Sequence, residues 1–485
     1  MTQIEHQQSE ADPLGLPLFA TIPPPTNTLP STAGRSVARR DPVPASSVDW
    51  GLVAELRVQA SEQLSQAVAA DRGRLDPAAQ QELGRSVVLD LVEQSMAERV
   101  NAGETAWSLA EQEHLARAVF DALFRLGRLQ SLVDDDRVEN IIIAGHDNVL
   151  LEMVDGSLSE GPAVADSDAE LIDFLVFLAS RSEVNARSFS EANPRLHLRL
   201  DGGARLAAAA WVTPRPSVVI RRHRLMSVTL EDLVERELMT PVLASFLRAA
   251  VRARRSIVVA GAQGVGKTTL VRALCAEINP LEAIGTFETE YELHLHQLPH
   301  HKIVHAWEAR PGTGERGPDG RAAGEFTLDE ALIDSFRFNL SRQIVGEVRG
   351  KEIWAMIKAM ESGTGSLSTT HAADAISAVR KLVTCAMEAG PHVTQELATS
   401  KLAATVDLVV QLMMTTTTGP NPSRRRMVSE VVALAPGERE AGYAATQVFS
   451  ANRRGVAVAG VLPEEYRALA NFGFDLAGYL QEAQP

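Results

Sequence analysis

A glycine-rich segment in the middle of the chain has the residue types and spacing needed to bind phosphate. It reads Gly261-Ala262-Gln263-Gly264-Val265-Gly266-Lys267-Thr268-Thr269 and fits the pattern G-x-x-x-x-G-K-[ST]. Glycine allows the backbone to curl until its N–H groups face phosphate oxygens. In such a loop Lys267 reaches the β- and γ-phosphates, and the Thr268 hydroxyl ligates Mg²⁺. The alternative is a chance glycine-rich turn that binds nothing.

The flanks of this segment supply the setting that a phosphate-binding loop requires. Residues 256–260 form a short β-branched run typical of a buried strand, and a helix is predicted from Lys267 toward Cys275. The amino end of that helix adds a positive dipole next to the phosphates. Strand, loop and helix together predict a nucleoside triphosphate site with Mg²⁺.

Hydrolysis of a phosphoanhydride also needs acids near the metal and the attacking water. Glu347 ends a predicted strand over 343–347, where nucleotide-hydrolysing folds place a metal-side acid. Glu288 and Glu292 follow the strand predicted over 283–287 and are candidates for positioning the water. His371 follows another strand and could sense the γ-phosphate. A histidine buried only for packing is the alternative for His371.

Positive charge on the transition state would come from arginine. Candidates are Arg205, Arg221, Arg222, Arg337 and Arg349, and the residues alone do not rank them. A predicted hairpin over 195–209 carries Arg195, His197 and Arg199 on one face, which is either solvated or turned toward phosphate.

A histidine-rich stretch between residues 294 and 305 invites a zinc interpretation. It contains His294, His296, His300, His301 and His305. No cysteine pair or suitably spaced acid accompanies these residues, so a solvent-facing strand and loop is the prediction.

Composition limits the class of protein. The 485 residues allow about three domains, and 45% apolar with 22% charged residues is ordinary for a globular chain. The net charge of −15 argues against non-specific nucleic-acid binding. Two cysteines suit a reducing cytosol. No secretory signal and no apolar run of about 20 residues is visible, so we expect a cytoplasmic protein that docks on membrane proteins.

The chain divides into four predicted regions. Residues 1–47 are rich in Pro, Ser and Thr and predict a disordered tail. Residues 48–129 predict a helical bundle, residues 130–225 a small α/β domain, and residues 226–485 a larger α/β domain with its ligand at the carboxyl ends of the strands. Within the last region we expect a mobile excursion over 311–324, a helix from Thr327 to about Leu340, and an antiparallel pair over 406–412 and 424–432.

The motifs, in this order, resemble the secretion ATPase superfamily of type II and type IV secretion and type IV pilus motors. They are the phosphate loop, residues 287–293 (FETEYEL), residues 345–350 (VGEVRG) and residues 365–372 (GSLSTTHA). Residues 136–145 (DRVENIIIAG), 199–205 (RLDGGAR) and 219–222 (VIRR) are similar to the N-terminal domain of its CpaF-like, Tad pilus branch.

The resemblance implies a RecA-like P-loop domain, preceded by an N-terminal domain that contributes arginines to ATP in a hexameric ring. Arg205 and Arg221 then take precedence over the other arginines. Glu347 would act at Mg²⁺, Glu288 and Glu292 at the water, and His371 at the γ-phosphate. The motor would sit at the cytoplasmic face of the membrane and act on a polytopic inner-membrane platform, with no stable nucleic-acid partner.

The chain departs from the family pattern at three places. Thr289 stands where an Asp is usual, Arg337-Phe338-Asn339-Leu340-Ser341 replaces Arg-x-Arg-Pro-Asp, and a histidine common in the 363–365 turn is missing. These changes bear on the turnover rate and not on nucleotide binding, and they leave a slow, nucleotide-gated scaffold as one alternative to the motor. A ring-shaped nucleic-acid translocase is the other alternative, because helicases also use phosphate-loop hexamers, although the net negative charge argues against it.

Overall fold

A computed structural model describes most of the chain after its first 47 residues. The described residues are 48–70, 76–181, 189–222, 227–310, 312–318, 320–350, 352–388, 390–417, 423–437 and 442–483. The tail predicted over 1–47 lies outside them. Within the described ranges, no helix combines the length and apolar character needed to cross a membrane.

Three helices open the described chain and pack on one another. They are α1 (Trp50–Ala70), α2 (Pro77–Asn101) and α3 (Leu109–Phe124). The Asp76 side chain accepts a hydrogen bond from the backbone N–H of Ala79, and Ser108 with Glu111 forms a capping box. These side chains bond backbone N–H groups at the first turns of α2 and α3, which have no partner within the helix, and so fix where the two helices begin. Their apolar stripes form one core, which includes Val53, Leu56, Val88, Leu91, Leu115 and Val119.

A six-stranded antiparallel sheet follows, in the spatial order β3-β2-β1-β6-β5-β4. Its strands are β1 (Val138–Ala144), β2 (Val149–Met153), β3 (Leu158–Glu160), β4 (Arg195–Arg199), β5 (Arg205–Ala209) and β6 (Ser217–Arg221), and its helices are α4 (Gln130–Asp134) and α5 (Asp168–Arg181). The predicted hairpin is confirmed as β4 and β5, with Arg195, His197 and Arg199 on the exposed face of β4.

The remainder of the chain builds a nine-stranded sheet in the order β17-β16-β15-β14-β7-β13-β12-β8-β9. The six strands from β14 to β9 in this order are parallel, and β15 to β17 extend the sheet in antiparallel fashion. The strands are β7 (Ile257–Gly261), β8 (Ile284–Glu288), β9 (Val304–Glu308), β12 (Arg342–Val348), β13 (Ser366–Thr370), β14 (Leu408–Thr417), β15 (Ser423–Pro436), β16 (Tyr443–Ala451) and β17 (Ala457–Ala459).

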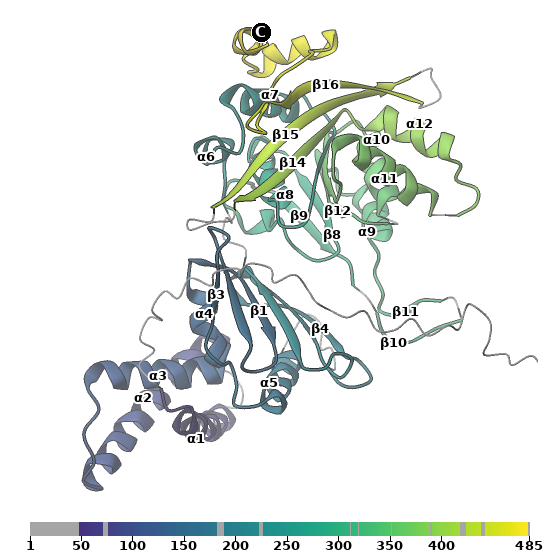
Figure 1. Cartoon of the computed structure of the whole chain (residues 1–485). Helices are drawn as coiled ribbons and strands as arrows, with labels where there is room; N and C mark the ends of the chain where they lie inside the picture. The colour runs from purple at the N-terminus through teal and green to yellow at the C-terminus, as the bar shows by residue number, and fades with distance from the viewer. Residues whose placement is uncertain are drawn as a thin grey trace, which may run out of the picture. The chain divides into compact units, whose positions relative to one another are not determined.

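Helices cover both faces of this sheet, which is the α/β arrangement predicted from the sequence. One face carries α6 (Leu230–Glu235), α7 (Pro241–Arg252), α8 (Lys267–Cys275) and the C-terminal α13 (Leu476–Glu482); the other carries α9 (Leu328–Ser335), α10 (Ile353–Glu361), α11 (Ala375–Met387) and α12 (Gln395–Thr405), as Figure 1 shows. The buried strand β7 contributes Ile257 and Val259 to the first core and Val258 and Ala260 to the second.

One local prediction differs from the structure. The helix that starts at the Thr327 cap ends at Ser335 rather than near Leu340, and Asn339 takes a left-handed backbone with φ of 51° that a continuing helix excludes. The excursion over 311–324 contains a short antiparallel hairpin, β10 (Thr313–Arg316) with β11 (Ala322–Ala323). The late antiparallel pair is confirmed as β14 and β15.

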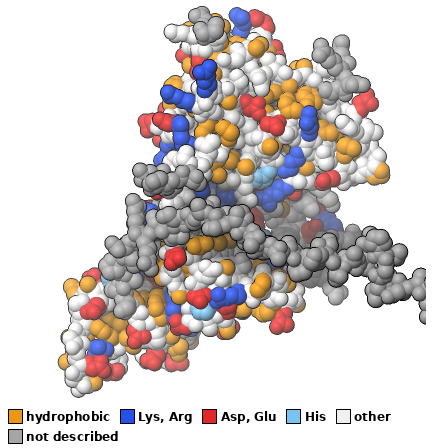
Figure 2. Space-filling view, viewed as in Figure 1, with side chains coloured by type: hydrophobic (Ala, Val, Ile, Leu, Met, Phe, Trp, Pro, Cys, Tyr) orange, Lys and Arg blue, Asp and Glu red, His pale blue; other side chains and the backbone are white. Residues whose placement is uncertain are grey.

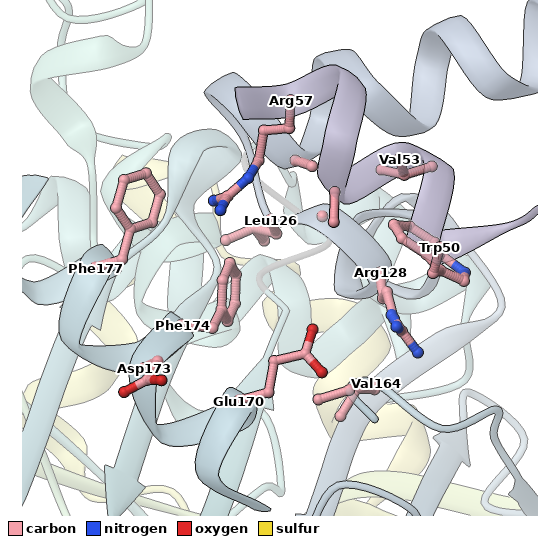
Figure 3. Close-up of a pocket in the computed structure, with 14 residues that line it drawn as sticks. Trp50, Val53, Arg57, Leu126, Arg128, Val164, Glu170, Asp173, Phe174 and Phe177 are labelled. Carbon is pink, nitrogen blue, oxygen red and sulfur yellow. The ribbon is translucent and has the colours of Figure 1, made fainter. Parts of the chain in front are cut away.

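A pocket of about 410 Å³ lies where α1 meets α5 and the turn after α3. Figure 3 shows Leu126 and Phe174 in its apolar part, with Arg57 and Glu170 reaching in from different sides. None of its lining residues belongs to the glycine-rich loop, so this pocket is separate from the candidate site described below.

The turn between α10 and β13 provides a test of the fold. Gly363 and Gly365 both have positive φ, 69° and 75°, but a Cβ on Gly363 meets nothing within 4 Å, whereas one on Gly365 lies 2.7 Å from the Arg254 backbone. We expect Gly363→Ala to lower the free energy of unfolding by about 1 kcal/mol and Gly365→Ala by at least about 3 kcal/mol. Urea denaturation of both variants measures the difference, and equal losses would contradict the packing described here.

Candidate active site

The glycine-rich loop joins the buried strand β7 to helix α8, as the sequence predicts. Gly261, Gly264 and Gly266 have φ values of 151°, 77° and 99°, which residues with a side chain rarely adopt. No atom lies within 4 Å of the position a Cβ would take on Gly264, and the nearest atom to that position on Gly266 is Arg426 Cδ at 3.9 Å. The loop backbone at Gly264 and Gly266 therefore has open space beside it at the amino end of α8.

The Lys267 side chain folds into this loop and is only 7% exposed. Its ammonium donates to the carbonyl oxygens of Gly261 at 3.1 Å and Ala262 at 2.9 Å, and lies 3.1 Å from Nδ1 of His371. Burial lowers the pKa of Lys267 to about 8. The three N–H groups of the ammonium thus have two carbonyl oxygens and the His371 ring as partners, and an entering anion could replace each of them.

His371 and Glu347 stand next to Lys267 because of the strand register. Thr370 of β13 pairs with Ala260 of β7 and with Val348 of β12, so the carboxyl ends of the three strands meet at one edge. His371 Nε2 lies 2.6 Å from Glu347 Oε1, and Arg349 donates to Glu347 Oε2 at 2.6 Å.

The surroundings of Glu347 keep its carboxylate ionised. Burial opposes ionisation, but the contacts with His371 and Arg349 outweigh it and lower the pKa of Glu347 to about 2. Because Lys267 faces Nδ1 of His371, the ring proton belongs on Nε2, toward Glu347.

The two acids after β8 occupy different environments. Glu292 is part-buried, and its Oε2 accepts a hydrogen bond from the Thr268 hydroxyl at 2.9 Å. Glu288 is 2% exposed, and its Oε1 accepts from the backbone N–H groups of Glu292 at 2.8 Å and Leu293 at 2.9 Å. Burial raises the pKa of Glu288 to about 7. Glu288 thus holds the turn that carries Glu292 to the loop.

Two of the five candidate arginines reach this edge from the six-stranded sheet. Arg205 of β5 and Arg221 of β6 are cross-strand partners. Arg205 forms an ion pair with Glu292 and donates to the carbonyls of Glu290 at 3.0 Å and Tyr291 at 2.9 Å. Arg221 is exposed, and its charge is near enough to add to the effect of burial in lowering the pKa of Lys267.

The other three arginines have different surroundings. Arg349 pairs with Glu347, as described. Arg222 donates to backbone carbonyls of Asp135 and Val138 and pairs with Asp136, so it closes the end of the six-stranded sheet. Arg337 is exposed and lies 3.9 Å from Asp334 on the same turn. The structure therefore places Arg222 and Arg337 on partners outside the glycine-rich loop.

Three further basic residues at the site were not singled out from the sequence. Arg426 of β15 donates to the Gly264 carbonyl at 3.0 Å, Arg272 donates to the carbonyls of Glu292 and Leu293, and the charge of Lys381 adds to the effect of burial on Lys267. The only sequence signal for Arg426 is the run of three arginines over 424–426. Successive residues of a strand point to opposite faces, so such a run places arginine on both faces of the sheet.

The histidine-rich stretch contains two buried side chains, so its prediction as wholly solvent-facing is wrong. His294 is 2% exposed and His301 is 7% exposed, and burial lowers the pKa of each to about 4. Both lie in the connection between β8 and β9, where local pattern gives no sign of burial. In the described ranges, no three His, Cys, Asp and Glu side chains are grouped to hold a metal ion.

With this geometry established, comparison with known proteins assigns the family. The family model described as "Type II/IV secretion system protein" matches residues 152–471, well over half of the chain. The chain belongs to this family. The matched residues include the phosphate loop, Glu288, Glu292, Glu347 and His371.

Individual relatives in the type II/IV secretion family match parts of the chain. The type IV secretion system protein PtlH of Bordetella pertussis is 36% identical over 187 residues, which are 38% of this chain and 52% of PtlH. The conjugal transfer protein TrbB of Rhizobium radiobacter is 26% identical over 310 residues, 63% of this chain and 87% of TrbB. The chain thus spans only about half the length of PtlH.

A solved structure is also similar to part of the chain. The VirB11 ATPase from the Brucella suis type IV secretion system, in complex with sulphate, is 25% identical and covers 66% of this chain and 96% of its own. Its TM-score is 0.33, so the family membership rests on the family model rather than on this superposition.

The buried carboxyl of Glu288 makes stability depend on pH. Its folded pKa of about 7 lies above the ordinary value of 4.5, so its stabilising contribution is complete below about pH 4 and is lost as pH rises through 7. We expect Glu288→Gln, which cannot ionise, to gain on the order of 2 kcal/mol relative to the native chain between pH 5 and pH 8.

Urea denaturation at several pH values measures this change. Glu290→Gln, which replaces an exposed carboxylate two residues away, serves as the control and should follow the native chain. A constant difference between Glu288→Gln and the native chain across this pH range would contradict a raised pKa in the folded protein.

Proposed function

We propose that this chain is the ATP-hydrolysing subunit of a secretion or pilus motor. The observation that carries the proposal is the grouping of Lys267, Thr268, Glu292, Glu347 and His371 at one edge of a parallel sheet, around a loop that fits phosphate. Family membership supports ATP as the nucleotide, as does the similarity to VirB11 of Brucella suis, which is an ATPase.

The proposed roles follow from the contacts of each side chain. Lys267 would exchange the carbonyls of Gly261 and Ala262 for phosphate oxygens, because an ionised acceptor binds an ammonium more strongly than a neutral carbonyl does. Glu292 is the acid that reaches the loop and would orient the attacking water. His371, released from Lys267, would take up a proton on Nδ1 and donate it in a hydrogen bond to the γ-phosphate.

The donor atoms at the loop fit Mg²⁺. Magnesium favours oxygen ligands and keeps several waters, so one hydroxyl and one or two carboxylates beside the phosphates are enough. The Thr268 hydroxyl already bonds a carboxylate, that of Glu292, and Glu347 stays ionised next to His371. We propose that Thr268 and Glu347 hold the ion, whose charge would neutralise the phosphate oxygens.

Arginines from the six-stranded sheet would complete the site. Arg205 and Arg221 are neighbours across β5 and β6, and both lie near the loop charges. On this proposal the two sheets separate and approach during each cycle, so that hydrolysis is coupled to mechanical movement. The proposal also includes the division of the chain into a tail (1–47), a helical bundle (48–129), an N-terminal α/β domain (130–225) and the ATPase domain (226–485).

The wider setting is also proposed. We infer a homohexamer at the cytoplasmic face of the membrane that acts on a polytopic membrane platform of a type II, type IV or Tad/Flp pilus system. Family membership supports this setting more than it supports a nucleic-acid translocase. On the face shown in Figure 2, basic and acidic side chains are interspersed rather than gathered in one continuous basic track.

ATP hydrolysis by the purified chain tests the proposal directly. We expect Mg²⁺-dependent release of phosphate, and Lys267→Ala should lower kcat/KM at least about 100-fold because the loop loses its only aliphatic ammonium. Lys358→Ala, on the exposed side of α10, should retain native activity. Binding of ATP without a rapid single turnover would instead favour the scaffold alternative.

Arginine variants test the contribution of the six-stranded sheet. Arg205→Ala and Arg221→Ala should each lower kcat at least about 100-fold while the affinity for ADP changes little, because their charges act on the transition state. Arg195→Ala, on the exposed face of the same hairpin, is the control and should leave kcat unchanged. Native kcat in both site variants would show that this sheet contributes no catalytic arginine.

A further inference from the structure

Two arginines of β15 connect the phosphate loop with the first strands of the six-stranded sheet. Arg426 donates through Nε to the Gly264 carbonyl at 3.0 Å and through Nη2 to Glu139 Oε1 at 2.6 Å. Arg424 donates through Nη1 to Glu139 Oε2 at 3.3 Å and pairs through Nη2 with Glu152. The strands that supply the acids are β1 and β2, far from the loop in sequence.

The bond to Gly264 fixes the direction of one backbone donor of the loop. The described peptide bonds are all trans, and in a trans peptide the C=O and the following N–H point in opposite directions. Holding the Gly264 carbonyl toward Arg426 therefore turns the N–H of Val265 away from β15. Gly264 has a φ of 77° and no neighbour where a Cβ would lie, so without this bond its peptide plane could rotate easily.

The position of Arg426 depends in turn on Glu139. A guanidinium is a rigid planar fork, so binding two acceptors in different directions sets the plane of the group. Glu139 is itself held between Arg424 and Arg426, and the three side chains are only 11–24% exposed. Asn140 donates to Glu152 at 2.6 Å and so ties the second acid to β1 as well. The chain of contacts runs from the loop to the sheet without a gap.

We propose that Arg426 is a positioning residue for the phosphate loop and that Glu139 sets it, so that the loop is fully arranged only when the six-stranded sheet is in place. This inference rests on the proposed function. Arg205 and Arg221 belong to the same sheet as Glu139, so one movement delivers the arginines and arranges the loop. Arg426 touches no reacting group in this arrangement; it acts through the loop backbone.

A mutant cycle on nucleotide affinity tests the proposal, with ADP as the probe and calorimetry as the measurement. The variants are Arg426→Gln, Glu139→Gln and the two combined. Arg425→Gln is the matched control, because Arg425 is the adjacent residue on β15 and pairs with the exposed Glu237 instead. If Arg426→Gln does not fold, Arg426→Lys replaces it, since lysine keeps the charge but lacks the planar fork.

We expect Arg426→Gln to weaken ADP binding about tenfold and Glu139→Gln about three- to tenfold, with the double variant no weaker than Arg426→Gln within about twofold. The control should bind as the native chain does. Native ADP affinity in both single variants would overturn the inference, and so would a double variant whose loss of ADP affinity is the product of the two single losses. Either result is compatible with ATP hydrolysis by the native chain. A native chain that binds no nucleotide would instead remove the proposed function itself.

Discussion

An ammonium group almost fully removed from water is the constraint on which the candidate site depends. Removing a charge from water is costly unless polar partners replace the lost hydration, and Lys267 obtains them from the carbonyls of Gly261 and Ala262 and from His371. These partners stand together only because parallel strands end at one edge and glycine lets the loop fold back on itself. The same arrangement leaves a positive charge that an anion entering the loop would bind.

Arginine–carboxylate contacts between the two sheets form the second layer of this arrangement. Arg205 binds Glu292, which also accepts from Thr268, while Arg426 links the loop to Glu139. Glu292 therefore occupies Arg205, a cation that a bound nucleotide could use, whereas Glu139 keeps Arg426 on the loop. In this state Arg205 and Thr268 are both paired with Glu292, and nucleotide binding would have to exchange these partners. Such an exchange would connect phosphate chemistry with movement of the six-stranded sheet.

The local parts of this picture could be predicted from the sequence, and the long-range parts could not. The phosphate loop, the helix start at Thr327 and the alternation of the β4–β5 hairpin depend on neighbours in the chain, and the structure has them as predicted. The choice among five arginines depends on which strands adjoin, and pattern alone left it open. The role of Arg426 arises from contacts with residues far along the chain. Burial of His294 and the early end of α9 likewise come from tertiary packing rather than local preference.

The central claim is that Lys267 and Thr268 exchange partners within the chain for a nucleotide held between the two sheets. An experimental structure of the chain with Mg²⁺ and a non-hydrolysable ATP analogue tests it most directly. We predict that the Lys267 ammonium leaves Gly261 and Ala262 for phosphate oxygens and that Thr268 leaves Glu292, with Arg205 or Arg221 at the terminal phosphate. An analogue bound elsewhere, or bound in the loop with Lys267 still on its carbonyls, would contradict the account.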